Sequence, residues 1–119
     1  MIEIRLKRAY EEPARSDGPR LLVDRLWPRG IAKKDAKLSD WLKEVAPSEE
    51  LRVWYDHDPE KWDEFRKRYG WELDANKTED FRKLKNHIRD QKRITLVYGA
   101  KDEVHNNAVA LKDFLQREK

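Results

Sequence analysis

The sequence predicts a single α/β domain over residues 1–119, in which a small, mainly parallel sheet is packed with helices. Three observations lead to this fold class. Two short apolar runs, at 21–23 and 94–98, are typical of strands that are covered on both faces. A series of helical patterns lies between the two runs, and a further helical pattern follows the second run. Strands that are separated by helices favour a right-handed parallel crossover.

The composition favours a folded domain with a heavily charged surface. Charged residues make up 43% of the chain and hydrophobic residues 38%, against about 25% and about 45–50% in typical globular domains. Five Trp, four Tyr and three Phe argue against disorder, because disordered segments are poor in aromatic residues. The chain has no apolar run of transmembrane length, no signal-peptide pattern and no cysteine. We therefore expect a cytoplasmic protein without disulfides, thiol chemistry or cysteine-bound zinc.

The first part of the chain is expected to supply two strands. Residues 2–6 alternate apolar and charged side chains, which is the pattern of a half-buried strand. A loop with strong breakers follows at 11–20. The buried run at 21–23 then continues to Asp24 and stops at the Leu-Trp-Pro-Arg-Gly sequence of 26–30. The direction of the first strand stays open, because only a loop joins the two strands.

Residues 38–90 are expected to form four helical segments. The first has an apolar face made of Leu38, Trp41, Leu42 and Val45. The second begins at Ser48, the third after Asp58-Pro59 and the fourth at Thr78, each with a capping side chain before acidic residues. The inward-facing residues are Leu51, Trp54 and Tyr55 in the second segment, Trp62, Phe65, Tyr69 and Leu73 in the third, and Phe81, Leu84 and Ile88 in the fourth.

A final helix is expected to begin just after Lys101. Its apolar stripe consists of Val104, Ala108, Leu111 and Leu115. The helix would start close to the end of the strand at 94–98. Its free backbone N–H groups would then favour an anion at that end of the sheet.

Polar residues follow both buried strands, at the position where parallel α/β sheets bind ligands. If the strands are neighbours, the loops at 24–30 and 98–106 lie side by side and form a pocket. Arginine forks suit phosphate and carboxylate groups, so we expect a small anionic ligand that carries one of these groups. The expected ligand-binding residues are Asp24, Arg25, Trp27, Arg29, Gly30, Lys101, Asp102 and Asn106.

Several of these residues have a structural alternative. Asp102 could cap the final helix, Arg25 could pair with a nearby acid, and Trp27 could fill the core beneath its loop. His105, placed in the first turn of the final helix, and His57, placed between two aspartates, are the candidates for acid–base catalysis. The sequence leaves open whether the protein only binds a ligand or also catalyses hydrolysis or group transfer.

No cofactor and no metal site are expected. The three histidines do not have the spacing of paired metal ligands, and the chain contains no HExxH motif. It also has no GxGxxG or GxxxxGK[ST] phosphate-binding loop and no GxSxG nucleophile motif.

The charge distribution adds two alternative partners. Residues 1–37 hold ten Lys or Arg and six Asp or Glu, a surplus of four positive charges in a chain of net charge +3. A nucleic-acid accessory protein would use Lys33, Lys34 or Lys37 and bind in a salt-dependent way, although such proteins usually have a stronger basic face. A protein-interaction module, for example a homodimer through an exposed Trp71, is the other alternative. No membrane partner is expected.

Four segments together resemble a known family. They are Val23–Gly30, Trp41–Ser48, His57–Trp62 and Tyr98–Asn106, and they resemble, in the same order, segments of the YeaO-like bacterial proteins, domain of unknown function 488. The resemblance covers nearly the whole chain and implies a small cytoplasmic α/β domain of bacteria or archaea with no established activity. The family's recurrent polar positions fall here on Arg25, Trp27, Arg29, Gly30, His57, Asp58, Lys101, Asp102, His105 and Asn106.

Overall fold

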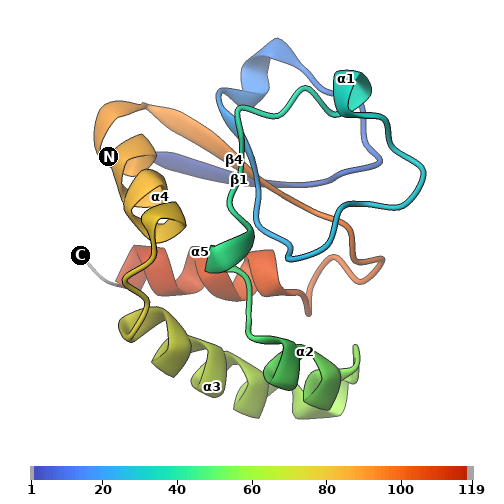
Figure 1. Ribbon diagram of the computed structural model, residues 1–119, viewed down its shortest axis with the longest axis vertical. Helices are drawn as coiled ribbons and strands as arrows, with labels where there is room; N and C mark the ends of the chain where they lie inside the picture. Colours follow the sequence, from blue (N-terminus) through green and yellow to red (C-terminus); the bar gives the residue numbers. More distant parts are fainter. Residues whose placement is uncertain (1, 118–119) are drawn as a thin grey trace.

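The computed structural model describes residues 2–117 and has one parallel sheet with helices packed on it (Figure 1). The strand order is β1-β4-β2-β3, where the strands are β1 (Glu3–Arg8), β4 (Arg93–Tyr98), β2 (Arg20–Leu22) and β3 (Asp40–Trp41). All three neighbouring pairs are parallel. The predicted single α/β domain with a small parallel sheet is confirmed, and the first strand runs parallel to its neighbour.

β4 forms the centre of the sheet and is covered on both faces. Ile94, Leu96 and Tyr98 are buried on one face, whereas Thr95 and Val97 are buried on the other. Both sets of alternating residues are therefore in the interior, which explains why this run shows no polar alternation in the sequence.

Helices cover one face of the sheet. α4 (Glu79–Asp90) and α5 (Asn107–Arg117) contact β4 directly, and α3 (Trp62–Asp74) packs against α5 and against α2 (Glu49–Tyr55). Figure 1 shows α5 and α3 below the sheet and the segment with α1 above it. No helix within residues 2–117 is long and apolar enough to cross a membrane. The cytoplasmic location stays a prediction.

A mostly irregular segment covers the other face. Leu22 and Val97 are buried there, and the segment 24–38 contains only one short helix, α1 (Lys33–Ala36). The partly buried side chains that pack against this second core are Trp27, Ile31, Leu38 and Trp41. The sheet is thus a middle layer between helices and the segment 24–38.

The same face holds a buried ion pair beside the start of β2. Arg20 Nη1 donates to Asp17 Oδ2 at 2.7 Å, and both side chains are only 4% exposed. Lys7 Nζ lies 3.1 Å from the other carboxylate oxygen. Burial alone would raise the pKa of Asp17, but hydrogen bonds from the Ala14 N–H, Lys7 and Arg20 outweigh burial and lower it. Asp17 is therefore a charged group in the interior.

The capping residues predicted for the central helices are confirmed. Ser48 caps α2 and Thr78 caps α4, because each hydroxyl accepts a hydrogen bond from a backbone N–H three residues later. Asp58 caps the short 3-10 turn Pro59–Lys61, which leads into α3. The side chains predicted to face inward on α2, α3 and α4 are buried or pack at the edge of the core.

The prediction of a helix around residues 38–45 is wrong. This segment contains β3 and the 3-10 turn Lys43–Val45, and the Leu42 N–H donates to the Leu22 carbonyl at 2.8 Å. Its apolar residues do not share one helical face but divide between the two cores. Leu38 and Trp41 join the core under the loop, whereas Leu42 and Val45 join the core under the helices.

The final helix begins at Asn107 and not just after Lys101. The Asp102 carboxylate accepts hydrogen bonds from the two backbone N–H groups at 104 and 105, each at 2.9 Å, and so holds a local turn instead of helix. Asn106 accepts a hydrogen bond from an N–H in the first turn of α5, at 3.0 Å. Val104, predicted on the helical stripe, is 62% exposed.

We predict that Leu22→Ala lowers the free energy of unfolding by about 2–5 kcal/mol, because it opens a cavity between the sheet and the 24–38 segment. Urea denaturation provides the measurement. The matched control is Leu26→Ala, since Leu26 is 62% exposed. If the two variants lose equal stability, the loop does not form a packed second layer.

Candidate functional site

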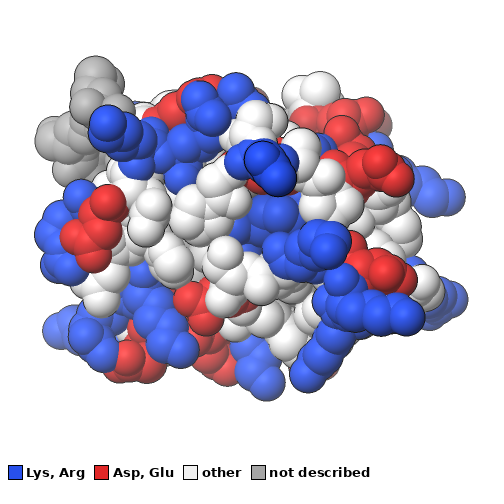
Figure 2. All heavy atoms as spheres, turned by 90° about the horizontal axis from the view of Figure 1, so that it is seen from above, with Lys and Arg blue, Asp and Glu red and all other residues white. Residues whose placement is uncertain are grey.

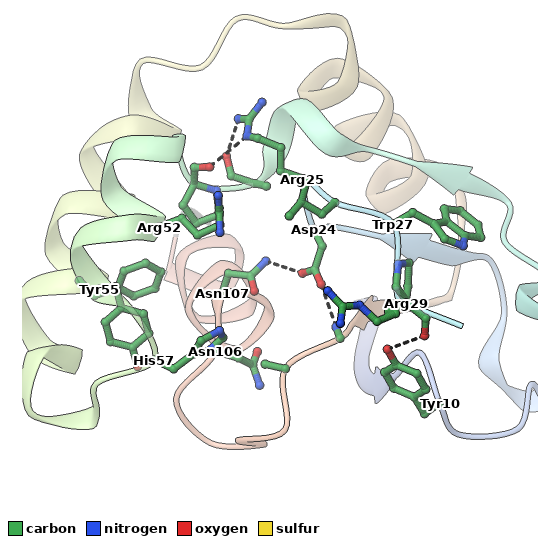
Figure 3. A pocket seen from close by; sticks show the side chains of 17 residues that line it. Tyr10, Asp24, Arg25, Trp27, Arg29, Arg52, Tyr55, His57, Asn106 and Asn107 are labelled. Carbon is green, nitrogen blue, oxygen red and sulfur yellow. Dashed lines mark hydrogen bonds between the residues drawn. The ribbon is translucent and has the colours of Figure 1, made fainter. Parts of the chain in front are cut away.

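A pocket of about 520 Å³ lies at the carboxyl edge of the sheet (Figure 3). Segments that follow all the strands contribute to it: Tyr10 after β1, 24–29 after β2, 46–47 after β3 and parts of 99–107 after β4. Residues in and just after α2 supply a further wall. Because the four strands are parallel, their carboxyl ends meet at this one edge, as the sequence suggested for β2 and β4.

The pocket forms where the chain leaves two neighbouring strands in opposite directions. After β2, segment 24–38 crosses the face that carries Leu22 and Val97. After β4, the chain continues into α5, which packs on the opposite face. Diverging connections leave a crevice between adjacent strand ends, and this is where open parallel sheets commonly bind ligands.

Asp24 joins the two strand ends at the floor of the pocket. Its Oδ2 accepts a hydrogen bond from the Gly99 N–H at 2.8 Å, and its Oδ1 accepts one from Asn107 Nδ2 at 3.1 Å. The same Asn107 nitrogen donates to the Val23 carbonyl at 3.0 Å. Burial raises the pKa of Asp24, and the two hydrogen bonds and the nearby His57 offset only part of that rise. Within residues 2–117, Asp24 forms no ion pair with a lysine or arginine.

Arg25 lines the pocket wall, but its guanidinium bonds to the protein itself. Nε donates to the Pro47 carbonyl at 3.3 Å and Nη2 donates to the Ala46 carbonyl at 3.4 Å. Nη1 also lies 3.5 Å from a carboxylate oxygen of Glu44. Figure 3 shows this guanidinium directed toward the neighbouring loop and away from Asp24. The structural alternative described for Arg25 is therefore the arrangement that is found.

Arg29 and Arg52 bring two further guanidinium groups to the pocket. Both residues are exposed, and in the described part of the chain neither side chain makes a hydrogen bond or an ion pair. Arg29 comes from the loop after β2, where the Tyr10 hydroxyl donates to its carbonyl at 3.0 Å. Arg52 comes from α2. Their planar forks are available for an anionic group of a ligand.

His57 reaches the pocket from an unusual turn after α2. Asp56 ends the helix with φ at 46°, a left-handed conformation that is common at helix C-termini. His57 repeats this conformation with φ at 55°, which a non-glycine residue adopts at a cost of about 1–2 kcal/mol. Tyr55, next to the turn, donates its hydroxyl to the His105 carbonyl at 2.8 Å. This bond ties the turn to the loop after β4.

His105 and Asp102 form a pair beside the pocket. His105 Nδ1 lies 3.0 Å from Asp102 Oδ2, and the Trp62 ring packs edge-on against the imidazole at 5.4 Å between centroids. Hydrogen bonds from the backbone N–H groups of His105 and Val104 lower the pKa of Asp102 to about 2. The carboxylate therefore stays charged at neutral pH and orients the imidazole.

Trp27 and Gly30 mainly shape the loop after β2. The Trp27 indole donates to the Ile31 carbonyl at 2.7 Å and packs edge-on against Trp41, with ring centroids 5.4 Å apart. Trp27 thus fills the second core, as its structural alternative proposed, and it also lines the pocket. Gly30 has φ at 83°, which a tight turn requires and other residues rarely adopt.

The structure brings part of the predicted set into the pocket. The predicted residues that line it are Asp24, Arg25, Trp27, Arg29, His57 and Asn106, whereas those that do not line it are Gly30, Lys101, Asp102 and His105. The polar lining residues that sequence reasoning missed are Tyr10, Arg52, Tyr55 and Asn107. Asn107 directly follows the predicted loop 98–106, so its position next to that loop was the signal that could have identified it.

No metal centre is found within residues 2–117. No three His, Asp or Glu side chains come together in a way that could hold a metal ion. Two His–Asp pairs occur, His105 with Asp102 and His87 with Asp40, each at 3.0 Å, and each provides only two ligands.

The three lysines of the predicted basic surface do not line the pocket. Lys33, Lys34 and Lys37 are exposed on and just after α1, and none of them lines the pocket. Figure 2 shows one face of the molecule with Lys and Arg spread widely and with Asp and Glu between them. A nucleic-acid role through these lysines stays a prediction, and it concerns a surface separate from the pocket.

Comparison with known proteins identifies the family. Residues 3–119 match the family model DUF488-N3i, which is described as the inactive DUF488-N3 subclade. The chain belongs to this DUF488 subclade. The resemblance to YeaO-like proteins is thereby confirmed.

The DUF488 relatives include proteins from three bacteria. The uncharacterized protein YeaO of Escherichia coli (strain K12) is 41% identical over 115 residues, which cover 97% of this chain and 98% of YeaO. Uncharacterized proteins of Mycobacterium tuberculosis (strain H37Rv) and Mycobacterium bovis are each 51% identical over 82 residues, 68% of this chain and 70% of the relative. No solved structure matches the chain significantly.

We predict that Asn107→Ala lowers the free energy of unfolding by about 1–3 kcal/mol, because it removes the donor to Asp24 Oδ1 and to the Val23 carbonyl. The loss will be larger at neutral than at acidic pH. Losing the donor raises the pKa of Asp24 further, and a raised native pKa makes stability fall as the pH rises. Urea denaturation at two pH values tests this, with Asn86→Ala on α4 as the control. Equal losses at both pH values would contradict the prediction.

We predict that Asp102→Asn makes the melting temperature depend less on pH between pH 2 and 5. The native pKa of Asp102 is about 2, below the ordinary 3.8, so its contribution is present above pH 4 and is lost as the pH falls toward 2. Asparagine keeps an acceptor for the local turn but has no charge to lose. Melting temperatures recorded between pH 2 and 5 test this, with the exposed Asp35→Asn as control. A variant profile that parallels the wild type would refute the role of Asp102.

Proposed function

We propose that this DUF488 protein binds a small anionic molecule, with a phosphate or carboxylate group, in the pocket at the carboxyl edge of its sheet. Arg29 and Arg52 take the anionic group. The observation that carries the proposal is that two guanidinium groups, without partners inside the described chain, line one pocket. Arginines in such positions are suited to bidentate hydrogen bonds with planar or tetrahedral anions.

The shape of the pocket supports a small molecule as the ligand. Its volume of about 520 Å³ lies within the range of small-molecule sites, which is about 300–1,000 Å³. Apolar walls supply contact area, and a few polar groups provide orientation, as is typical of such sites. The apolar and aromatic lining residues are Tyr10, Leu26, Trp27, Pro28, Ala46, Pro47, Tyr55, Phe65 and Ala100.

Binding without catalysis fits the candidate acid–base groups better than turnover does. His105 is oriented by Asp102, but it does not line the pocket. His57 lines the pocket, but within residues 2–117 no hydrogen bond orients its ring. A general base usually needs both placement and an orienting partner. The description of the matched family as an inactive subclade agrees with this proposal.

Thermal-shift and calorimetric titrations with inorganic phosphate, small carboxylates and nucleoside monophosphates test the proposal. A ligand that binds the native state raises the melting temperature. We expect Arg29→Ala and Arg52→Ala each to weaken binding about tenfold or more, since each removes a charge-assisted hydrogen bond.

Arg15→Ala is the matched control, because Arg15 is an exposed arginine in the turn before β2 and does not line the pocket. Its affinity is expected to stay within about twofold of the wild type. A variant with Lys33, Lys34 and Lys37 replaced by alanine is expected to bind equally well. The proposal is overturned if no probe stabilises the wild type, or if these controls weaken binding as much as the loss of Arg29 or Arg52.

A further inference from the structure

We infer that the ligand carries a second group, an ammonium or a hydroxyl, which donates hydrogen bonds to Asp24 at the floor of the pocket. The ligand class is therefore a phosphate or carboxylate that is also an amine or an alcohol, and not a simple anion. This inference rests on the proposed anion site and adds the chemistry of the opposite end of the ligand.

The Asp24 carboxylate has capacity that the protein does not use. An ionised carboxylate offers about four lone-pair positions, whereas within residues 2–117 Asp24 accepts only the Gly99 N–H and the Asn107 amide. Asp24 itself lines the pocket. The remaining positions are available to a donor that enters from the pocket.

The electrostatics of the site also favour a donor beside Asp24. A partly buried carboxylate without a cationic partner is costly, and a donor or cation that replaces water there recovers part of the cost. Arg25, the arginine that follows Asp24 directly in the chain, is committed to the carbonyls at 46 and 47. A simple anion next to Asp24 would instead meet a like charge.

The pocket holds charged groups of both signs. Figure 3 shows Asp24 between the strand ends, with the Arg29 guanidinium overlapping its carboxylate in this view and Arg52 farther away on α2. The pocket thus offers guanidinium groups from two elements and one carboxylate from the end of β2. A ligand with an anionic end and a donating end satisfies both, and the volume of about 520 Å³ leaves room for a carbon chain between them.

A series of phosphate monoesters with one changed terminus tests the inference. Ethyl phosphate, 2-hydroxyethyl phosphate and 2-aminoethyl phosphate share the phosphate and differ only in a methyl, hydroxyl or ammonium end, and the three-carbon series provides a longer reach. We expect the ammonium compound to bind the wild type about tenfold more tightly than the methyl compound in the better-fitting series, with the hydroxyl compound between them.

Asp24→Asn is the decisive variant. It keeps the size of the side chain but removes the negative charge, so we expect the ratio of the affinities for the ammonium and methyl esters to fall to about one. Asp35→Asn, an exposed position on α1, is expected to keep the preference. A second measurement needs no variant: in an NMR titration of the wild type, the ammonium ester will lower the pKa of Asp24, and ethyl phosphate will not.

The outcomes separate this inference from the proposed function. If all esters bind equally well and depend on Arg29 and Arg52, the anion site stands and the inference about Asp24 is wrong. The inference is also wrong if Asp24→Asn keeps the ammonium preference or if the ammonium ester leaves the Asp24 pKa unchanged. If no ester binds the wild type at millimolar concentration, this inference fails, whereas the proposed function fails only if inorganic phosphate, small carboxylates and nucleoside monophosphates also leave the wild type unstabilised.

Discussion

The hydrogen bond between the Gly99 N–H and the Asp24 carboxylate, at 2.8 Å, joins the ends of β2 and β4 at the point where their chains separate. The position favours glycine at 99, because a Cβ atom there would stand 3.3 Å from Asp24 Oδ2, a tight contact. Asn107 adds a second connection, since its amide donates to both Asp24 and the Val23 carbonyl. The first turn of α5, the end of β2 and the end of β4 are therefore fixed relative to one another. Hydrogen bonds between three elements therefore hold the floor of the pocket together, although its walls come from loops.

Much of the fold could be predicted from the sequence, because short runs of residues indicate buried strands and helix caps. The apolar runs of β2 and β4 have buried faces on both sides, and capping hydroxyls at Ser48 and Thr78 bond to nearby backbone. β3 was not predicted, because a strand of two residues is too short to show an alternating pattern. It forms through pairing with β2, and the apolar spacing around it matches a helix only by coincidence. The late start of α5 depends on the Asp102 turn, which competes locally with helix formation.

The sequence predicted the location of the candidate site better than it predicted which residues line it. Parallel strands bring their ends to one edge, so the loop after β2 and the loop after β4 could be placed together from the strand pattern alone. Arg52 could not be assigned, because a charged residue on a helix gives no sign of which neighbour it faces. The partners of Arg25 are the backbone carbonyls at 46 and 47. Every residue has such a carbonyl, so the sequence does not indicate which of them Arg25 contacts. Side-chain type predicted the kind of chemistry, while the tertiary fold decided which arginines remain available for it.

The three-residue strand β2 has an aspartate on each side with opposite acid behaviour. Before the strand, the pKa of Asp17 is lowered, and Arg20 depends on its charge. After the strand, the pKa of Asp24 is raised, so that carboxyl accepts a proton more readily. Moderate acidification therefore neutralises the pocket floor while the Asp17–Arg20 pair is still intact, and stronger acid then leaves a buried guanidinium without its counterion. Strong acid therefore removes a charge that stabilises the turn 15–17 on the sheet, whereas protonation of Asp24 favours the native state, because its native pKa is raised.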